Sequence, residues 1–146
     1  MSTEENKAIA RRVYDEGFNA HNPAIVDELF TTDADIVQDV LSPSPGFRGG
    51  REGVKQALAM ISGAFPDWWV TVEDMIAEGD KVVTRYTGQG TQRGEFMGIP
   101  ATGKRVTTTV IDIFRIADGK VAEAWVEADN LGLMQQLGMI PTPGKE

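Results

Sequence analysis

The sequence predicts a single α+β domain in which a curved antiparallel sheet and a few helices enclose an internal pocket. Apolar residues recur with helical spacing up to about residue 64, and from Pro66 onward they alternate with a period of two. Helices followed by a meander of strands place the helices on one face of the sheet. A chain of 146 residues has the length of one domain, so we expect residues 1–146 to form one unit.

Three helices are predicted in the first half of the chain. Ser2 and Glu5 have the spacing of a capping box, in which each side chain bonds a free backbone N–H of the first turn. Asn22 and Pro23 are typical of a new helix start, with Asn as the N-cap and Pro at the first position. A third helix is predicted over about 51–64, because its apolar residues form one stripe.

The strands follow from β-branched and aromatic residues that alternate with polar ones. A first strand is predicted over 34–41, and it ends at a proline-rich loop, 42–46. Four longer strands are predicted over 68–78, 81–92, 104–116 and 120–128, with glycine-containing hairpin turns at 78–80 and 118–119. A short helix over 131–137 follows, and the residues from about 140 to 146 form a frayed tail.

Composition excludes several classes of function. The 14 Lys and Arg residues are outnumbered by 22 acidic ones, for a net charge of −8, so a nucleic-acid partner is not expected. No apolar run approaches the ~20 residues of a membrane span, and the N-terminus lacks a signal-peptide pattern. We therefore expect a cytoplasmic protein. With one histidine and no cysteine, a transition-metal site would need carboxylates alone, and because no such cluster is visible we expect no metal site.

The segments FPDWWVTVEDMIAEGDKVVTRYTGQGTQRGEFMGIPATGKRV and DIFRIADGKVAEAWVEADNLGLMQQLG, together with the earlier YDEGFNAHNPAIVDELF, resemble the SnoaL-like polyketide cyclase (ester cyclase) family of the NTF2-like superfamily. The resemblance covers most of the chain. It implies a cone-shaped α+β barrel with a pocket between sheet and helices, and a homodimer joined through the sheet. It also implies ring closure by intramolecular aldol condensation without metal or organic cofactor.

The resemblance implies a catalytic pair on the last two long strands. Asp112 stands at the position of the family's histidine, and Val126 stands after Trp125 at the position of the family's acid. Asp112 interrupts an apolar run, and a carboxylate that faces an apolar cavity has a raised pKa and suits general acid–base catalysis. In the alternative, its side of the strand is wet or it pairs with an arginine such as Arg85.

Other polar residues are weaker candidates. Asp129 is a second possible catalytic acid, although it also stands where an N-cap of the last helix is expected. If Val126 faces the cavity, strand alternation turns Glu127 outward. His21 lies in a predicted turn, where a solvated side chain is the commoner outcome. Asp39 is retained as an early-strand acid whose direction the alternation leaves open.

Aromatic residues are predicted to line the pocket, with Tyr14 and Gln92 as hydrogen-bond donors to a ligand carbonyl. Each of them could instead fill the core. The predicted substrate-binding residues are Tyr14, Phe18, Phe65, Trp69, Tyr86, Gln92 and Val126, and Phe96 is a further candidate.

The sequence thus leaves two functions open. The first is a cofactor-free proton-transfer enzyme acting on an apolar, carbonyl-bearing small molecule by aldol-type ring closure, isomerisation or dehydration. The alternative is a non-catalytic small-molecule-binding or interaction domain of the same fold. In either case the long strands have apolar residues on both faces, and one helix layer covers only one face. We therefore expect a homodimer.

Overall fold

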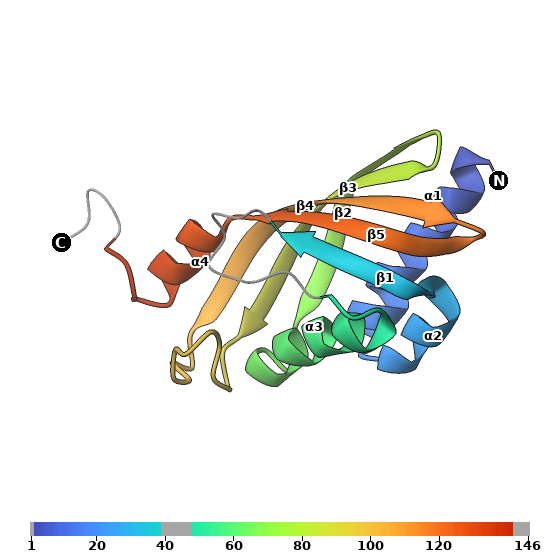
Figure 1. The fold of residues 1–146 in the computed structure, drawn as a ribbon. Coiled ribbons are helices and arrows are strands. Elements are labelled where there is room, and N and C mark those ends of the chain that lie inside the picture. The colour runs from blue at the N-terminus through green and yellow to red at the C-terminus, as the bar shows by residue number, and fades with distance from the viewer. Residues whose placement is uncertain (1, 39–47, 142–146) are drawn as a thin grey trace.

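A computed structural model describes residues 2–38 and 48–141 (Figure 1). Residues 39–41 of the predicted first strand, Asp39, the loop 42–46 and the tail from 142 lie outside this range. In chain order the elements are α1 (Thr3–Arg12), the π-helix η1 (Val13–Asn19), the 3-10 helix η2 (Pro23–Ile25), α2 (Val26–Leu29), β1 (Phe30–Gln38), α3 (Arg51–Ala64), β2 (Trp69–Glu78), β3 (Lys81–Thr91), β4 (Arg105–Ala117), β5 (Lys120–Ala128) and α4 (Asn130–Gln136).

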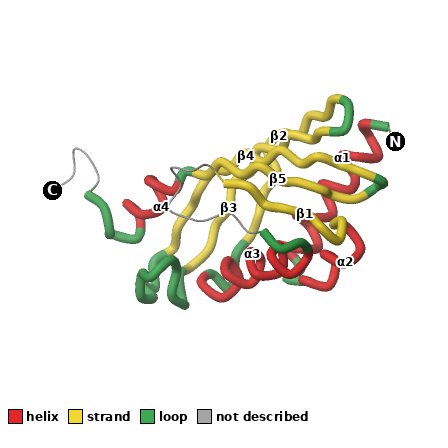
Figure 2. The backbone as a smooth tube through the Cα atoms, viewed as in Figure 1, coloured by secondary structure: helices red, strands yellow, loops and turns green. Residues whose placement is uncertain are grey.

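One five-stranded sheet has the order β1-β5-β4-β3-β2. The pairs formed by β2, β3, β4 and β5 are antiparallel, and β1 joins the edge parallel to β5. Helices α1, α2 and α3 all lie on the concave face, and α4 lies at one end of the sheet (Figures 1 and 2). The predicted α+β architecture is therefore confirmed, with one parallel pair that the sequence did not indicate.

The predicted helices form, with changes at their boundaries. The capping box is present, because Ser2 Oγ accepts from the Glu5 N–H at 3.1 Å and Glu5 accepts from the Ser2 N–H at 3.2 Å. The first helix changes at Val13 into the π-helix η1, which a period of 3.6 does not reveal. The second helix is short, and Phe30 already begins β1, four residues before the predicted start of that strand. Helix α3 has the predicted bounds.

Two side-chain amides hydrogen-bond backbone groups of β2 and β4 on a side where no neighbouring strand pairs with them. Asn19 of η1 bonds both backbone groups of Val70, at 2.9 and 2.7 Å. Gln136 of α4 bonds both backbone groups of Thr107, at 2.8 and 2.7 Å. Thr107 lies beyond Val110, the last β4 residue paired with β5. These bonds attach η1 and α4, which both border the cavity described below, to the backbone of the sheet.

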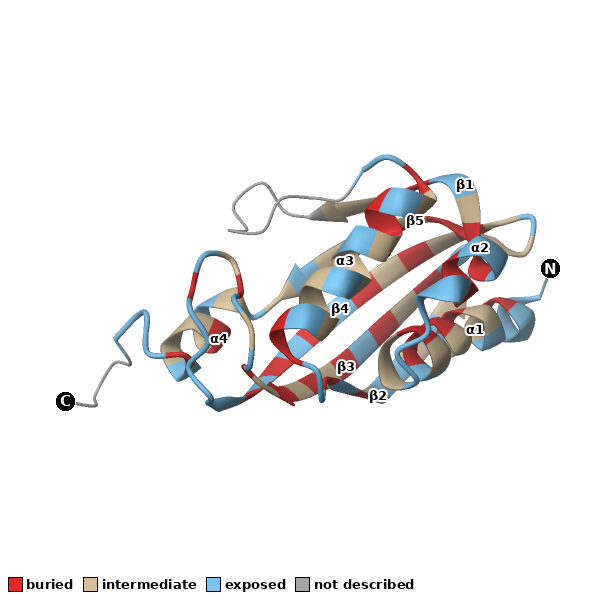
Figure 3. Ribbon diagram, turned by 90° about the horizontal axis from the view of Figure 1, so that it is seen from below, coloured by how far each residue is buried: buried red, intermediate tan, exposed pale blue. Residues whose placement is uncertain are grey.

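The hydrophobic core fills the space between the concave face and the helices (Figure 3). Strands β3 and β4 alternate between buried and accessible residues along most of their length, as expected when one face of a sheet packs on a core. The largest fully buried apolar side chains are Tyr14, Phe65, Val26, Val54, Val82, Val106 and Val121. Within the described residues, no helix is long and apolar enough to cross a membrane.

The Trp68 ring lies so close to Gly88 of β3 that this position has no room for a side chain. A Cβ atom at this residue would lie 2.2 Å from Cζ2 of Trp68. We therefore expect Gly88→Ala to lower the free energy of unfolding by about 1–3 kcal/mol, the usual cost of overpacking. Gly63 in α3 has no atom within 4 Å of such a Cβ. Gly63→Ala should therefore raise stability by roughly 0.5–1 kcal/mol, the gain in helix propensity. Urea denaturation of both variants measures the difference, and equal effects would contradict the close contact.

Candidate functional site

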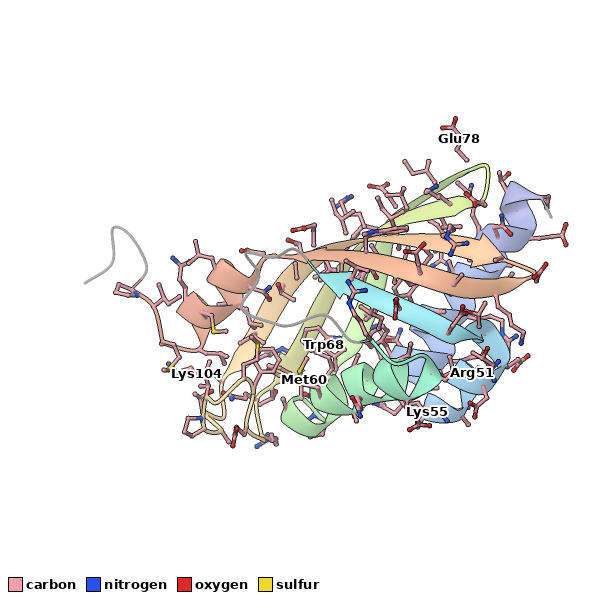
Figure 4. All side chains as sticks on the ribbon, in the orientation of Figure 1. Arg51, Lys55, Met60, Trp68, Glu78 and Lys104 are labelled. Carbon is pink, nitrogen blue, oxygen red and sulfur yellow. The ribbon has the colours of Figure 1, made fainter. Side chains whose placement is uncertain are left out.

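A cavity of about 140 Å³ lies between the concave face of the sheet, α3 and the end of η1. A cavity of roughly this size holds a molecule such as benzene. Its walls are mainly apolar, and Met60 of α3 and Trp68 both lie on this side of the sheet in Figure 4. The lining residues are Val13, Phe18, Phe30, Ile36, Val54, Ala57, Leu58, Met60, Ile61, Phe65, Trp68, Tyr86, Phe96, Met97, Thr108, Val110, Asp112, Phe114, Ala124, Val126, Ala128, Asn130 and Leu133.

Asp112 lies on the concave face of β4 and lines this cavity. It is 4% exposed and stands between Thr84 of β3 and Val126 of β5 in the strand register. Arg85, the arginine considered as a partner from the sequence, is paired instead with Asp74, at 2.7 Å. Asp112 is the one charged side chain among the described residues that line the cavity.

The two oxygens of the Asp112 carboxyl have different surroundings. Oδ2 accepts a hydrogen bond from the Tyr14 hydroxyl at 2.9 Å, whereas Oδ1 is buried without a partner. Burial raises the pKa of Asp112 from 3.8 to about 7, although the bond from Tyr14 acts in the opposite direction. The group therefore exchanges a proton near neutral pH. Since Oδ2 already accepts from Tyr14, that proton resides on Oδ1.

Two tyrosines surround this carboxyl, and both remain protonated at neutral pH. Burial, together with the charge of Asp112, raises the pKa of Tyr14 and of Tyr86 well above the usual value. The Tyr14 ring packs against the Tyr86 ring at 5.2 Å and the Phe114 ring at 5.7 Å between centroids. This packing fixes the Tyr14 hydroxyl against Asp112. The Tyr86 side chain borders the cavity itself.

The structure brings most of the predicted pocket residues together. Phe18, Phe65, Tyr86, Phe96 and Val126 all line the cavity. Tyr14 is not among the described residues that line the cavity. Its hydroxyl donates to Asp112 rather than to a ligand.

Trp69 does not lie in the cavity. It is 55% exposed and pairs with Gln89, whereas Trp68 is 5% exposed and lines the cavity. The turn that ends α3 explains this difference, because the Trp68 N–H bonds the Phe65 carbonyl at 3.0 Å and the strand begins only at Trp69. The glycines Gly88 and Gly90 were a usable signal, since they make room for the Trp68 ring.

Gln92 also has a role that differs from the expected one. Its side chain is fully buried, donates to the Ile99 carbonyl at 3.1 Å and accepts from both the N–H and the hydroxyl of Thr102. These bonds fasten the loop between β3 and β4. Gln92 is not among the described residues that line the cavity.

The remaining candidates lie away from the cavity. Asp129 is exposed and caps α4, accepting from the Gly132 N–H at 2.9 Å. Glu127 is exposed on the outer face, as the alternation indicates when Val126 lines the cavity. His21 is exposed in the turn after η1. Within residues 2–38 and 48–141, no three His, Asp or Glu side chains form a set that could hold a metal ion.

Comparisons with known proteins agree with this geometry. The family model described as SnoaL-like polyketide cyclase matches residues 8–137. TsrD of Streptomyces laurentii is 32% identical, with a TM-score of 0.84 over 96% of this chain and 99% of its own. A protein of Jannaschia sp. CCS1, assigned as a SnoaL-like polyketide cyclase, is 28% identical, with a TM-score of 0.85 over 95% of both chains. IdmH of Streptomyces antibioticus, assigned as a polyketide cyclase, is 32% identical, with a TM-score of 0.75 over 91% of this chain and 98% of its own. Curated protein sequences give no match.

The raised pKa of Asp112 predicts a pH-dependent stability. The folded protein holds this proton to higher pH than the unfolded chain, so the group's contribution to the free energy of unfolding falls as pH rises from 3.8 to about 7. Asp112→Asn removes this dependence. The variant should therefore gain stability relative to wild type as pH rises, up to about 4 kcal/mol above neutrality. Urea denaturation over a range of pH measures the difference, and a constant difference would contradict the raised pKa.

Proposed function

Since this chain belongs to the SnoaL-like polyketide cyclase family, we propose that it catalyses proton transfer on a neutral, carbonyl-bearing small molecule, without a cofactor. The observation that supports this most strongly is a buried carboxyl with one unpartnered oxygen in an apolar cavity. Such a group serves as a general base or acid near neutral pH. The reaction classes that fit are aldol-type ring closure, isomerisation and dehydration.

In the proposed ring closure, Asp112 acts twice. The Oδ1 atom of its carboxylate removes a proton from the carbon next to one carbonyl, which forms an enolate. The enolate carbon then forms a bond to a second carbonyl carbon of the same molecule. The resulting alkoxide takes the proton back from Oδ1, so the carboxylate is regenerated. A pKa of about 7 suits a group that must both accept and return a proton at neutral pH.

Tyr86 is the proposed hydrogen-bond donor to the enolate oxygen. Its side chain borders the cavity, and its raised pKa keeps the hydroxyl protonated at neutral pH. Tyr14 has a positioning role, because it occupies Oδ2 and thereby leaves Oδ1 for the substrate. Donors that are already oriented toward developing negative charge stabilise a transition state most in a site without water.

The apolar cavity walls favour a neutral substrate. No described lining residue has a positive charge that could offset an anionic group, and Asp112 itself repels one when it is ionised. Transfer of an unpaired charge into an apolar site has a large free-energy cost. A ketone or diketone therefore fits the cavity better than a carboxylic acid of the same size.

We expect Asp112→Asn to abolish most of the activity while the fold is retained. A suitable probe is a linear methyl diketone whose carbonyls are separated by three methylene groups, because its ring closure and dehydration give a cyclohexenone. The turnover should fall by about 10²–10⁴, the usual contribution of general acid–base catalysis. Absorbance of the enone measures ring closure, and deuterium incorporation from heavy water measures proton abstraction by itself.

Two matched variants make this test selective. Asp118→Asn makes the same chemical change in an exposed turn, and it should leave turnover unchanged. Asp129→Asn retains an N-cap and tests the second candidate acid. Loss of activity in Asp129→Asn alone would assign catalysis to that residue. Binding of the diketone with neither ring closure nor deuterium exchange would favour the alternative, a non-catalytic binding domain.

We further propose that a second copy of the chain covers the outer face of the sheet. An apolar row crosses all five strands there, with charged residues in the rows on both sides. The row consists of Val37, Trp125, Ile113, Val83 and Ile76, each of which is the register partner of the next across the sheet. Ile76 is 66% exposed and the neighbouring Ile111 is 47% exposed. A self-complementary apolar row is what a twofold-symmetric interface requires.

Ile113→Asp tests this assembly, because it places a charge at the centre of the row and does not border the cavity. We expect wild type to be a dimer at tens of micromolar, on the order of typical weak-dimer affinities. The variant should be a folded monomer. Light scattering measures the mass, and a wild-type monomer at this concentration would contradict the proposal.

A further inference from the structure

The loop between β3 and β4 is a fixed wall of the cavity. At its base, the Gln92 N–H bonds the Lys104 carbonyl and the Gly103 N–H bonds the Gln92 carbonyl, both at 2.9 Å. The buried Gln92 side chain adds bonds to Ile99 and Thr102 within the loop. Phe96 is buried, with its ring 5.3 Å from that of Phe65. The conformation of the loop tip is therefore strongly determined.

The tip of this loop contains a methionine in an unfavourable backbone conformation. Phe96 and Ile99 exchange two backbone hydrogen bonds, at 3.0 and 2.8 Å, around the two-residue turn Met97-Gly98. Both turn residues have positive φ, 50° and 82°, as a type I′ turn requires. Gly, Asn and Asp are the residues that tolerate this conformation at low cost. The Asp118-Gly119 turn, with φ of 52° and 75°, follows this preference, whereas Met97 departs from it.

The Met97 side chain is half-buried and borders the cavity. A residue that occupies a strained position next to a binding site often does so because its side chain has a function there. Methionine is long, unbranched and adaptable, which suits a residue that closes an apolar space.

The cavity extends along β4 from Asp112 toward the loop between β3 and β4. Thr108, Val110, Asp112 and Phe114 all line the cavity from β4. From Asp112 to Thr108, toward the loop, the strand extends roughly 13 Å at about 3.3 Å per residue. A ligand whose carbonyl reaches Asp112 has room to extend its apolar end along β4 toward the loop that contains Met97.

We propose that Met97 is a specificity-determining residue that sets the length of the apolar ligand accepted by the cavity. This inference rests on one part of the proposed function, namely that a small apolar molecule enters this cavity. Met97 stands at the tip of the loop, and its side chain lines the cavity from there. The side chain thus limits how far a ligand extends beyond Asp112.

Binding of two homologous series tests the limit. Phenyl ketones and alkylbenzenes of increasing chain length are titrated by calorimetry into wild type, Met97→Leu and Met97→Ala. Affinity should rise about fourfold per buried methylene until the chain meets the wall. Met97→Ala removes three heavy atoms, so its affinity should continue to rise for about three more methylenes. Met97→Leu retains the bulk and should retain the wild-type limit.

Stability tests the backbone strain separately. With the side chain removed, Met97→Gly should have a higher Tm than Met97→Ala, because glycine alone adopts positive φ without strain. Met60 also borders the cavity but lies within α3. There the order should be reversed, with Met60→Ala more stable than Met60→Gly. If Met97→Ala is at least as stable as Met97→Gly, the claim that the backbone is strained at Met97 would be wrong.

The binding results separate this inference from the proposed function. An unchanged length limit in Met97→Ala, or no binding of either series to any variant, would overturn the role of Met97. If the limit moves as expected but ketones bind no better than alkylbenzenes and Asp112→Asn has no effect on either, Met97 retains its role and the carbonyl chemistry is lost.

Discussion

The rest of the site depends on one interaction, the hydrogen bond from the Tyr14 hydroxyl to a carboxyl buried in an apolar cavity. Asp112 and Tyr14 are 98 positions apart in the sequence, so this bond forms only when the N-terminal helical segment packs on β4. A buried carboxyl without partners would be far more costly, because each unmet hydrogen-bonding atom loses its hydration. Tyr14 reduces that cost at one oxygen and leaves the other available.

The same burial has opposite effects on stability and on chemistry. Above neutral pH the folded protein must hold a charge in an apolar site, which lowers the free energy of unfolding. The raised pKa that results is what allows a carboxyl to exchange protons near pH 7. Sites that break a local rule of packing in this way are common where function requires it. In the proposed function, the apolar walls that raise the pKa also disfavour charged ligands, so the proposed reactivity and selectivity share one physical origin.

Much of the fold follows from local sequence patterns. The four long strands lie within one residue of their predicted bounds, because their alternation is long and their turns contain glycine. The same alternation put Val126 and Glu127 on opposite faces of β5, whereas the inner position of Val126 was only an expectation from the family resemblance. Asp112 could be selected from the sequence because it interrupts an apolar run. Its unpartnered oxygen, and the bond from Tyr14, depend on packing between distant segments, which periodicity does not encode.

The differences have equally local causes. The apolar spacing around Phe30 fits either the end of a helix or the start of a strand. Its parallel pairing with β5, which makes it a strand residue, is a nonlocal contact that the spacing does not reveal. Trp68 and Trp69 are adjacent aromatics at the start of a strand, where alternation alone cannot assign the inner one. The turn at the end of α3 and the glycines of β3 make that choice. The left-handed conformation of Met97 likewise follows from its two-residue turn, whose register only the folded loop fixes.

The most direct test of the account is the pKa of Asp112 itself. NMR titration of its carboxyl carbon, assigned by comparison with Asp112→Asn, should give a midpoint of about 7. Tyr14→Phe should move that midpoint higher, because the bond from Tyr14 lowers the pKa. A midpoint near the ordinary value of 3.8 would show that the carboxyl is hydrated and ionised at neutral pH, and would contradict both the buried site and the chemistry built on it.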